Sequence, residues 1–240
     1  MLKNVDFYSS NLKLFGVLAN KKSCRQGVVF LHGGGQSSSR RFEFLQNYFL
    51  DRGIASLAID FRGCGLSEGN FQDGSLANRT IDAGEAIRLF QKMTGLNLSQ
   101  IYIWGSSMGG HVACRVSVRF PEIKGLILQS PAAYGQKAEN VELGQEFTLL
   151  IRKSGSWENS PAFLDLEKFE NRILVAYGEH DIDIPEGVKT RYKKITESRG
   201  GKSVILEEGA HRLLSPQKDA EKMALQKLAQ TTVDFIGEES

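Results

Sequence analysis

A serine between two glycines is the first feature of this chain that could do chemistry. The stretch Gly105-Ser106-Ser107-Met108-Gly109 fits the pattern G-x-S-x-G only with Ser107 at its centre. The apolar run Ile101–Trp104 precedes the stretch, and a helical pattern from Ser107 to Phe120 follows it. A sharp turn from strand to helix exposes the hydroxyl of such a serine. The sequence therefore predicts Ser107 as a nucleophile.

A serine hydroxyl is a weak nucleophile, so it needs a base and a group that orients the base. Two later loops, each after an apolar run, offer these partners: "GEHDIDIP" contains Asp181 and "EEGAHRLL" contains His211. His211 would take the hydroxyl proton, and Asp181 would hold the imidazole and stabilise its charged form. Asp183 and Glu179 share the loop with Asp181, so a shift of the acid by two residues stays open.

A third loop, "FLHGGGQSSS", contains Gly33, Gly34 and Gly35 directly after a predicted strand. Glycines let the backbone approach a ligand closely and present an N–H group to a developing oxyanion. We expect the N–H of Gly34 to serve in this way, with Gly35 as the alternative. The N–H of Met108, at the start of the helix after Ser107, would be its partner.

The elements that must position these residues alternate along the chain. Short apolar runs predict strands at residues 27–32, 54–60, 101–104, 125–130, 172–178 and 203–209. Helical patterns cover about residues 41–52, 76–94, 107–120, 185–198 and 216–236. This alternation predicts an α/β fold with a mostly parallel sheet and helices on both faces. An antiparallel hairpin of Val5–Tyr8 and Leu12–Ala19 precedes it.

One segment, residues 131–169, interrupts the alternation between two strands. We interpret it as a short cap insertion over the sheet edge, helical in part from Val141 to Lys153. Its apolar side chains should make a roof, and charged neighbours should make a wet rim; the apolar set is Phe147, Leu149, Leu150, Ile151, Trp157 and Phe163. A chain of 240 residues otherwise suits one domain, residues 1–240.

Composition excludes several classes of function. Lys and Arg number 30 against 28 for Asp and Glu, so the near balance gives no sign of a nucleic-acid partner. No segment approaches the roughly 20 apolar residues of a membrane span, and we expect no membrane partner. The cysteines, Cys24, Cys64 and Cys114, lack the C-x-x-C spacing of a zinc site or a redox motif. We expect a cytoplasmic protein without a metal or organic cofactor.

The motifs "HGGG", "DFRGCGLSEG", "GSSMGG", "GEHD" and "GAH" occur in the order found in the α/β-hydrolase superfamily, which the chain resembles over nearly its whole length. The stretches "IASLAIDFRGCGLSEGNF" and "GSSMGGHVA" are similar to those of small bacterial carboxylesterases, including feruloyl and cinnamoyl esterases, related acyl thioesterases and S33-type peptidases. The resemblance implies the α/β-hydrolase fold, with an eight-stranded sheet and a cap after the sixth strand.

The resemblance also implies roles for Ser107, Asp181 and His211 as a catalytic triad, and for Gly34 and Met108 as the oxyanion hole. Ser106 departs from the histidine that is frequent at its position in the family, which changes the hydrogen bonding beneath the nucleophile. Asp60 and Arg62 fall in a structural loop beside the site.

The sequence therefore predicts a serine hydrolase that cleaves small carboxylic esters, with short to medium or aromatic acyl groups, through an acyl-enzyme on Ser107. Acyl thioesterases and aminopeptidases of the same fold use the same catalytic parts, and a non-catalytic ligand-binding hydrolase fold is a further alternative. The sequence leaves the natural substrate and the oligomeric state open.

Overall fold

The computed structural model describes residues 2–238, which begin with the predicted hairpin. Strands β1 (Leu2–Ser9) and β2 (Leu12–Ala19) pair in antiparallel register. Ser10 and Asn11 connect them with φ angles of 47° and 67°. A two-residue turn with both residues at positive φ matches the twist of the strands that it joins.

The hairpin extends a parallel sheet, and the predicted eight-stranded, mostly parallel α/β fold is confirmed. The remaining strands are β3 (Gln26–Leu31), β4 (Ile54–Ile59), β5 (Ile101–Ser106), β6 (Gly125–Gln129), β7 (Arg172–Gly178) and β8 (Lys202–Leu206). Their order is β1-β2-β4-β3-β5-β6-β7-β8, and all pairs from β4 to β8 are parallel. The carboxyl ends of these strands therefore lie along one edge, where the predicted site residues follow them.

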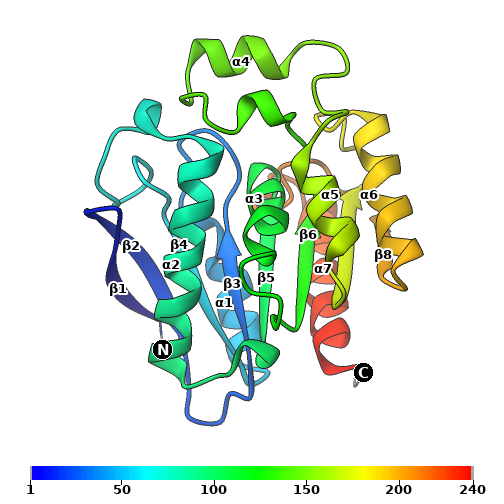
Figure 1. Ribbon diagram of the computed structural model, residues 1–240. Coiled ribbons are helices and arrows are strands. Elements are labelled where there is room, and N and C mark those ends of the chain that lie inside the picture. Colours follow the sequence, from blue (N-terminus) through cyan, green and yellow to red (C-terminus); the bar gives the residue numbers. More distant parts are fainter. Residues whose placement is uncertain (1, 239–240) are drawn as a thin grey trace.

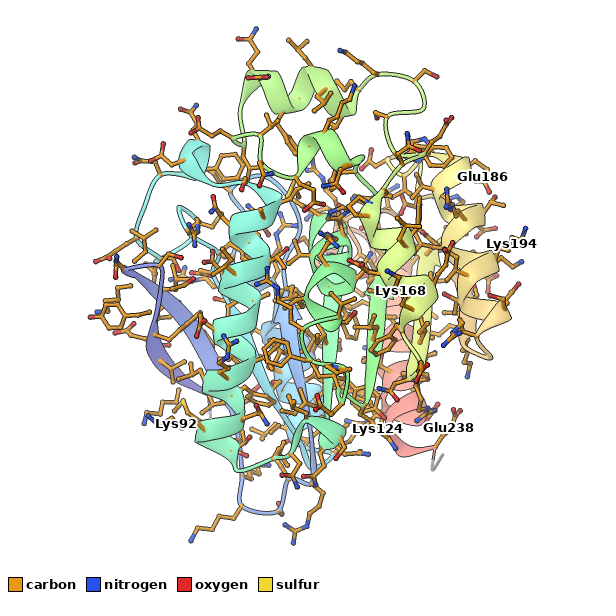
Figure 2. All side chains as sticks on the ribbon, viewed as in Figure 1. Lys92, Lys124, Lys168, Glu186, Lys194 and Glu238 are labelled. Atoms are coloured by element: carbon orange, nitrogen blue, oxygen red, sulfur yellow. The ribbon has the colours of Figure 1, made fainter. Side chains whose placement is uncertain are left out.

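Helices cover both faces of the sheet (Figure 1). One face carries α2 (Leu76–Thr94), α3 (Met108–Ser117), α5 (Pro161–Lys168) and α6 (Glu186–Ser198), and the other carries α1 (Glu43–Leu50) and α7 (Asp219–Gly237). Short 3₁₀ turns lie at η1 (Ser39–Phe42), η2 (Phe71–Asp73), η3 (Leu98–Gln100) and η4 (Gln136–Ala138). The exposed lysines Lys92 and Lys194 mark the outer sides of α2 and α6 (Figure 2).

The central strands, β3 to β7, are buried on both sides because helices cover both faces there. In β3, Val29 and Leu31 belong to the core under α2 and α3, whereas Val28 and Phe30 belong to the core under α1 and α7. Phe30 stacks on Phe42 with ring centroids 4.6 Å apart. Two cores therefore hold β3 and β5 rigidly at the centre of the sheet, next to the loops that contain the candidate site.

The predicted cap range, residues 131–169, contains two different structures. Helix α4 (Gln145–Ile151) lies over the edge of the sheet (Figure 1). Helix α5 instead packs on the face of the sheet against α3, where Asp165 forms an ion pair with Arg115. The expectation that the whole range lies over the sheet edge thus fits its first part, while α5 is the crossover helix between β6 and β7.

The part of the range above the sheet leaves and rejoins the body at one place. The N–H of Gln136 donates to the carbonyl of Asn159 at 3.3 Å, so the two ends of this loop are bonded together. We call residues 136–159 the cap loop and this contact its neck. Among residues 2–238, no helix combines the length and the apolar character that a membrane crossing requires.

Candidate active site

The turn at Ser107 has the strained backbone that the motif predicts. Ser107 lies at φ 52° and ψ −116°, a region that non-glycine residues rarely adopt and that costs of order 1–3 kcal/mol. A side chain on Gly105 would collide with the carbonyl of Gly109, and one on Gly109 would collide with the carbonyl of Leu31. The two glycines are therefore required for α3 to pack this close to β5 and β3, which leaves the serine at the tip of the turn.

The structure brings Ser107, His211 and Asp181 together in a hydrogen-bonded line. The Oγ of Ser107 lies 3.1 Å from Nε2 of His211. On the other side of the imidazole, Nδ1 lies 3.1 Å from each carboxylate oxygen of Asp181. With Nδ1 protonated toward Asp181, Nε2 is free to accept the serine proton. This geometry is that of a nucleophile, a general base and the group that orients the base.

Asp181 is built to stay ionised. Burial opposes the charge on its carboxylate, but hydrogen bonds from His211 and from the backbone N–H of Ile184 outweigh burial and hold the pKa of Asp181 below its usual value of 3.8. Asp183, the alternative two residues later, is exposed, and its backbone N–H donates to the Oδ1 of Asp181 at 3.1 Å. The other alternative, Glu179, accepts from the N–H of Glu208. Asp181 is thus the acid that contacts His211.

Ser106 supports the turn from below. Its Oγ donates to the Oε1 of Gln129 at 2.5 Å, and the Nε2 of Gln129 donates to the carbonyl of His211 at 3.4 Å. This chain of contacts connects the serine turn to the loop of His211. The hydroxyl of Ser106 is therefore engaged by Gln129, although both residues line a pocket beside Ser107. Gln129, to which the sequence pointed in no way, joins two of the loops that form the site.

The glycine loop lies directly against Ser107 and Met108. An added Cβ on Gly33 would lie 3.2 Å from the Cβ of Ser107, and one on Gly34 would lie 3.2 Å from the Cε of Met108. The carbonyl of Gly33 accepts hydrogen bonds from Nη1 of Arg79 at 3.1 Å and from Nδ1 of His32 at 2.8 Å. Because the C=O and N–H of a trans peptide point in opposite directions, these bonds turn the N–H of Gly34 away from Arg79.

His32 is neutral, so one of its ring nitrogens donates a hydrogen bond and the other accepts one. Burial, reinforced by the charge of Arg79, lowers the pKa of His32 from 6.5 to about 3. Its Nε2 accepts the backbone N–H of Phe61 at 3.3 Å, so the proton resides on Nδ1 and points to Gly33. The sequence analysis assigned no role to His32 or Arg79. The histidine directly before three glycines was the available signal, whereas Arg79 lies 46 positions from Gly33 in the sequence.

The second predicted donor, the N–H of Met108, opens helix α3. The first N–H groups of a helix have no partner within it, and they lie at the positive end of its dipole. Gly35, the alternative to Gly34, adopts φ 69°, and its carbonyl accepts a weak hydrogen bond from the Sγ of Cys64. The structure thus places both Gly34 and Met108 beside Ser107.

The cap loop is tied to the body beneath it by His111. The N–H of Tyr134 donates to Nδ1 of His111 at 3.3 Å, and Nε2 of His111 bonds to the buried carboxylate of Glu139 at 2.7 Å. The guanidinium of Arg115 lies 3.4 Å from the same carboxylate. His111 is therefore a structural anchor, and Glu139 is engaged in the interior and does not face the substrate.

Asp60 and Arg62 hold the neighbouring loop, as the resemblance implies. The carboxylate of Asp60 accepts the N–H groups of Ser39 and Leu66, at 2.6 and 2.8 Å. The guanidinium of Arg62 forms a buried ion pair with Asp82. Neither side chain lines the pockets that contain Ser107 and His211.

Two pockets meet at Ser107 and His211. The first, of about 390 Å³, lies along the glycine loop, and we call it the loop pocket. The second, of about 520 Å³, lies under the cap loop, and we call it the cap pocket; its apolar lining is Ala132, Ala133, Tyr134, Ile151, Trp157, Ile184 and Val188. Each is large enough for a small organic group. A substrate whose scissile bond lies above Ser107 would thus place one part in the loop pocket and the other part in the cap pocket.

The predicted roof differs from this lining in detail. Ile151 and Trp157 line the cap pocket as expected, with Arg152 and Lys153 at its rim. Phe163 instead packs on Tyr192 in the core of the body, and Leu149 is 61% exposed. Among residues 2–238, no cluster of three His, Cys, Asp or Glu side chains is arranged to hold a metal ion.

Comparison with known proteins matches residues 22–157, more than half of the chain, to the family described as "Serine aminopeptidase, S33". A multifunctional-autoprocessing repeats-in-toxin protein of Vibrio cholerae is 31% identical over 115 residues, which are 46% of this chain and 2% of the toxin. The 2-hydroxy-6-oxononadienedioate/2-hydroxy-6-oxononatrienedioate hydrolase 1 of Pseudomonas putida is 31% identical over 129 residues, 53% of this chain and 44% of that enzyme. The chain thus spans less than half the length of these two relatives.

Among solved structures, Est1E from Butyrivibrio proteoclasticus with bound ferulic acid superposes with a TM-score of 0.72 and 17% identity, over 98% of this chain and 100% of that chain. Likeness at this level of identity shows the fold. The matched family segment includes the glycine loop and the serine turn, and the structural likeness extends over the remaining strands and helices. The chain therefore belongs to the serine aminopeptidase S33 family and is an α/β hydrolase.

Proposed function

We propose that this hydrolase is a serine esterase that cleaves small carboxylic esters through an acyl-enzyme on Ser107. The observation that carries the proposal is the continuous hydrogen-bonded line from Ser107 through His211 to the buried Asp181. It lies where the glycine loop and the first turn of α3 also meet. These are the parts that acyl transfer requires.

In the proposed reaction, the Oγ of Ser107 attacks the ester carbonyl while Nε2 of His211 takes the hydroxyl proton. The N–H groups of Gly34 and Met108 stabilise the resulting oxyanion. His211 then gives the proton to the leaving alcohol, and an acyl-enzyme forms. A water molecule, deprotonated by His211, attacks this ester and regenerates Ser107 with release of the acid. Asp181 stays ionised throughout.

The cap pocket suits a small apolar or aromatic acyl group. Its lining includes the apolar side chains Ala133, Ile151 and Trp157, and its volume is about 520 Å³. The ferulic acid bound to Est1E and the butyrate bound to an esterase from Thermogutta terrifontis are acids of this kind in structures of the same fold. We also propose one domain over residues 1–240, in which the cap loop, residues 136–159, is the part of the predicted insertion 131–169 that covers the site. The buried free cysteines suit a cytoplasmic location.

The decisive experiment compares alkyl esters, acyl thioesters and aminoacyl amides of matched acyl groups in one buffer. We expect short aliphatic or aromatic esters to have the highest kcat/KM. An aminopeptidase needs a carboxylate to hold the free amino group of its substrate. Glu139 is buried against His111, and Glu142 does not line either pocket. If amides or long-chain thioesters have a kcat/KM about tenfold higher than that of the esters, the enzyme is an aminopeptidase or a thioesterase and not an esterase. A tenfold ratio corresponds to ~1.4 kcal/mol in transition-state binding.

The hydrogen bond from Arg79 to the carbonyl of Gly33 leads to a prediction for the substitution Arg79→Met. Losing the 3.1 Å bond leaves the Gly33 carbonyl held by His32 alone, so the orientation of the Gly34 N–H is less firmly fixed. We expect kcat to fall by about 10- to 100-fold with little change in KM, since an oxyanion donor acts in the transition state. Arg88→Met, on the exposed side of the same helix, is the matched control. A folded Arg79→Met variant with normal kcat would contradict the assignment.

A further inference from the structure

The loop pocket contains two arginines without a partner. Arg41 and Arg212 both line it, and both side chains are exposed. Within residues 2–238, neither guanidinium forms an ion pair or a hydrogen bond with another group of the chain. Arginines at a protein surface are usually satisfied by water. Two that converge on a pocket beside a reactive serine also form a ready binding site for an anion.

A buried hydroxyl lies in the same pocket. Ser37 is 5% exposed, and its Oγ has no hydrogen-bond partner within the described residues, 2–238. A buried polar group without a partner costs free energy, so such groups are normally satisfied by the chain, by water or by a ligand. Because Ser37 lines the loop pocket between the glycine loop and Arg41, an acceptor bound there would satisfy it.

Basic residues outnumber acidic ones in the linings of the two pockets that meet at Ser107. Arg41 and Arg212 line the loop pocket, Arg152 and Lys153 line the cap pocket, and Asp183 is the one acidic residue among the linings of both. Over the whole sequence, basic and acidic residues number 30 and 28, so this excess of positive charge is local. A cleft lined by one sign of charge attracts ligands of the opposite sign and raises their rate of association.

We propose that the natural substrate carries an anionic oxygen group, a carboxylate or a phosphate, and that Arg41, Arg212 and Ser37 bind this group in the loop pocket. This inference rests on the proposed esterase function and specifies its substrate class. The loop pocket takes the anion because its lining is polar near the arginines, with Gln36 and Ser37 beside them. The apolar part of the substrate then lies in the cap pocket on the other side of Ser107.

The test uses pairs of esters that differ in charge. Ethyl hydrogen adipate is compared with ethyl hexanoate for a carboxylate on the acyl side, and 4-acetoxybutyl phosphate with pentyl acetate for a phosphate on the alcohol side. We expect at least one anionic ester to exceed its neutral partner by tenfold or more in kcat/KM, chiefly through a lower KM. The pair that shows the preference identifies the anion together with the side of the ester that carries it, and 0.5 M salt should weaken the preference.

Variants then assign the preference to the loop pocket. In Arg41→Gln/Arg212→Gln, we expect the ratio of kcat/KM between anionic and neutral esters to fall by tenfold or more. Arg40→Gln is the matched control, because Arg40 is an exposed neighbour of Arg41 that does not line the loop pocket. A wild-type enzyme without any preference for the anionic esters, or a double variant that keeps it, would overturn the inference.

Binding to Ser107→Ala separates this inference from the esterase proposal, because it requires no turnover. Calorimetric titration of Ser107→Ala should show tighter binding of the preferred anionic ester than of its neutral partner. Adding Arg41→Gln and Arg212→Gln to Ser107→Ala should remove this difference in affinity. If wild type cleaves neutral esters but Ser107→Ala binds both members of a pair equally, the inference fails and the esterase stands. If no ester is cleaved, the esterase fails, and the titration alone decides whether the anion site exists.

Discussion

Ser107→Ala should abolish the hydrolysis of an activated ester and leave the fold intact. The hydroxyl alone forms the acyl-enzyme, and losses of a triad member are roughly 10⁴ to 10⁶ in kcat. Alanine keeps the Cβ of serine, so the packing of the turn between Gly105 and Gly109 is unchanged. The measurement is kcat for a nitrophenyl ester, together with the thermal unfolding midpoint of both proteins.

Ser106→Ala is the control for this substitution. Its hydroxyl bonds to Gln129 beneath the turn and does not contact His211, so we expect a much smaller loss of kcat. Near-normal turnover by Ser107→Ala with an inactive Ser106→Ala would mean that the nucleophile is the neighbouring serine.

Asp181→Asn should lower kcat by about 10⁴, which is a far larger loss than we expect for Asp183→Asn. An amide at position 181 donates to Nδ1 of His211 instead of accepting from it, so the proton moves to Nε2 and the base is blocked. Asp183 contributes only its backbone N–H to this network, and that group survives the substitution. Because the pKa of Asp181 lies below 3.8, its carboxylate is ionised throughout the neutral range, and Asp181→Asn should remain impaired at every pH from 6 to 9.

Steady-state kinetics of both variants with one alkyl ester would check this ranking. The reverse order of activities would assign the orienting role to Asp183 and contradict the hydrogen bonds between Asp181 and His211.

The sequence predicted the elements best where local patterns decide them. Helix α2 spans residues 76–94 as expected, because Ser75 caps its first turn by accepting the N–H of Asn78 and Gly95 ends it at φ 73°. The strands from β3 to β7 were found because burial on both faces makes them continuous apolar runs. Ser107 could be singled out because its glycine neighbours are required by the packing of one short turn.

Helix α5 was not predicted, although its signals are present. Ser160 precedes Pro161 at the first helical position, a common way to start a helix, and Ala162, Phe163 and Leu166 recur at helical spacing. The length of the interruption between β6 and β7 favoured a single insertion, and so the crossover helix was included in the cap. Phe163 was assigned to the roof for the same reason.

Two features of the site could not be predicted because they depend on contacts between residues far apart in the sequence. They are the hydrogen bond that holds the glycine loop and the pairing of two arginines in the loop pocket. Arg79 reaches Gly33 from another element, and Gln129 reaches His211 across 82 positions of sequence. No local spacing marks either pair. Arg41 follows β3 and Arg212 follows β8, far apart in the sequence. The two residues meet in one pocket because the loops after these strands lie at the same edge of the sheet.

The neck of the cap loop has a consequence for how this protein can change over evolution. Its two ends, Gln136 and Asn159, are already bonded to each other, so a longer or shorter segment between them leaves the body's β6–α5–β7 crossover untouched. The entropy of closing a loop grows only slowly with its length, by roughly 0.6 kcal/mol for each doubling. Glu139, Leu143 and Phe147 still anchor the first half of the segment to the body, so the stretch after α4, residues 152–155, is the part that can change length at little thermodynamic cost.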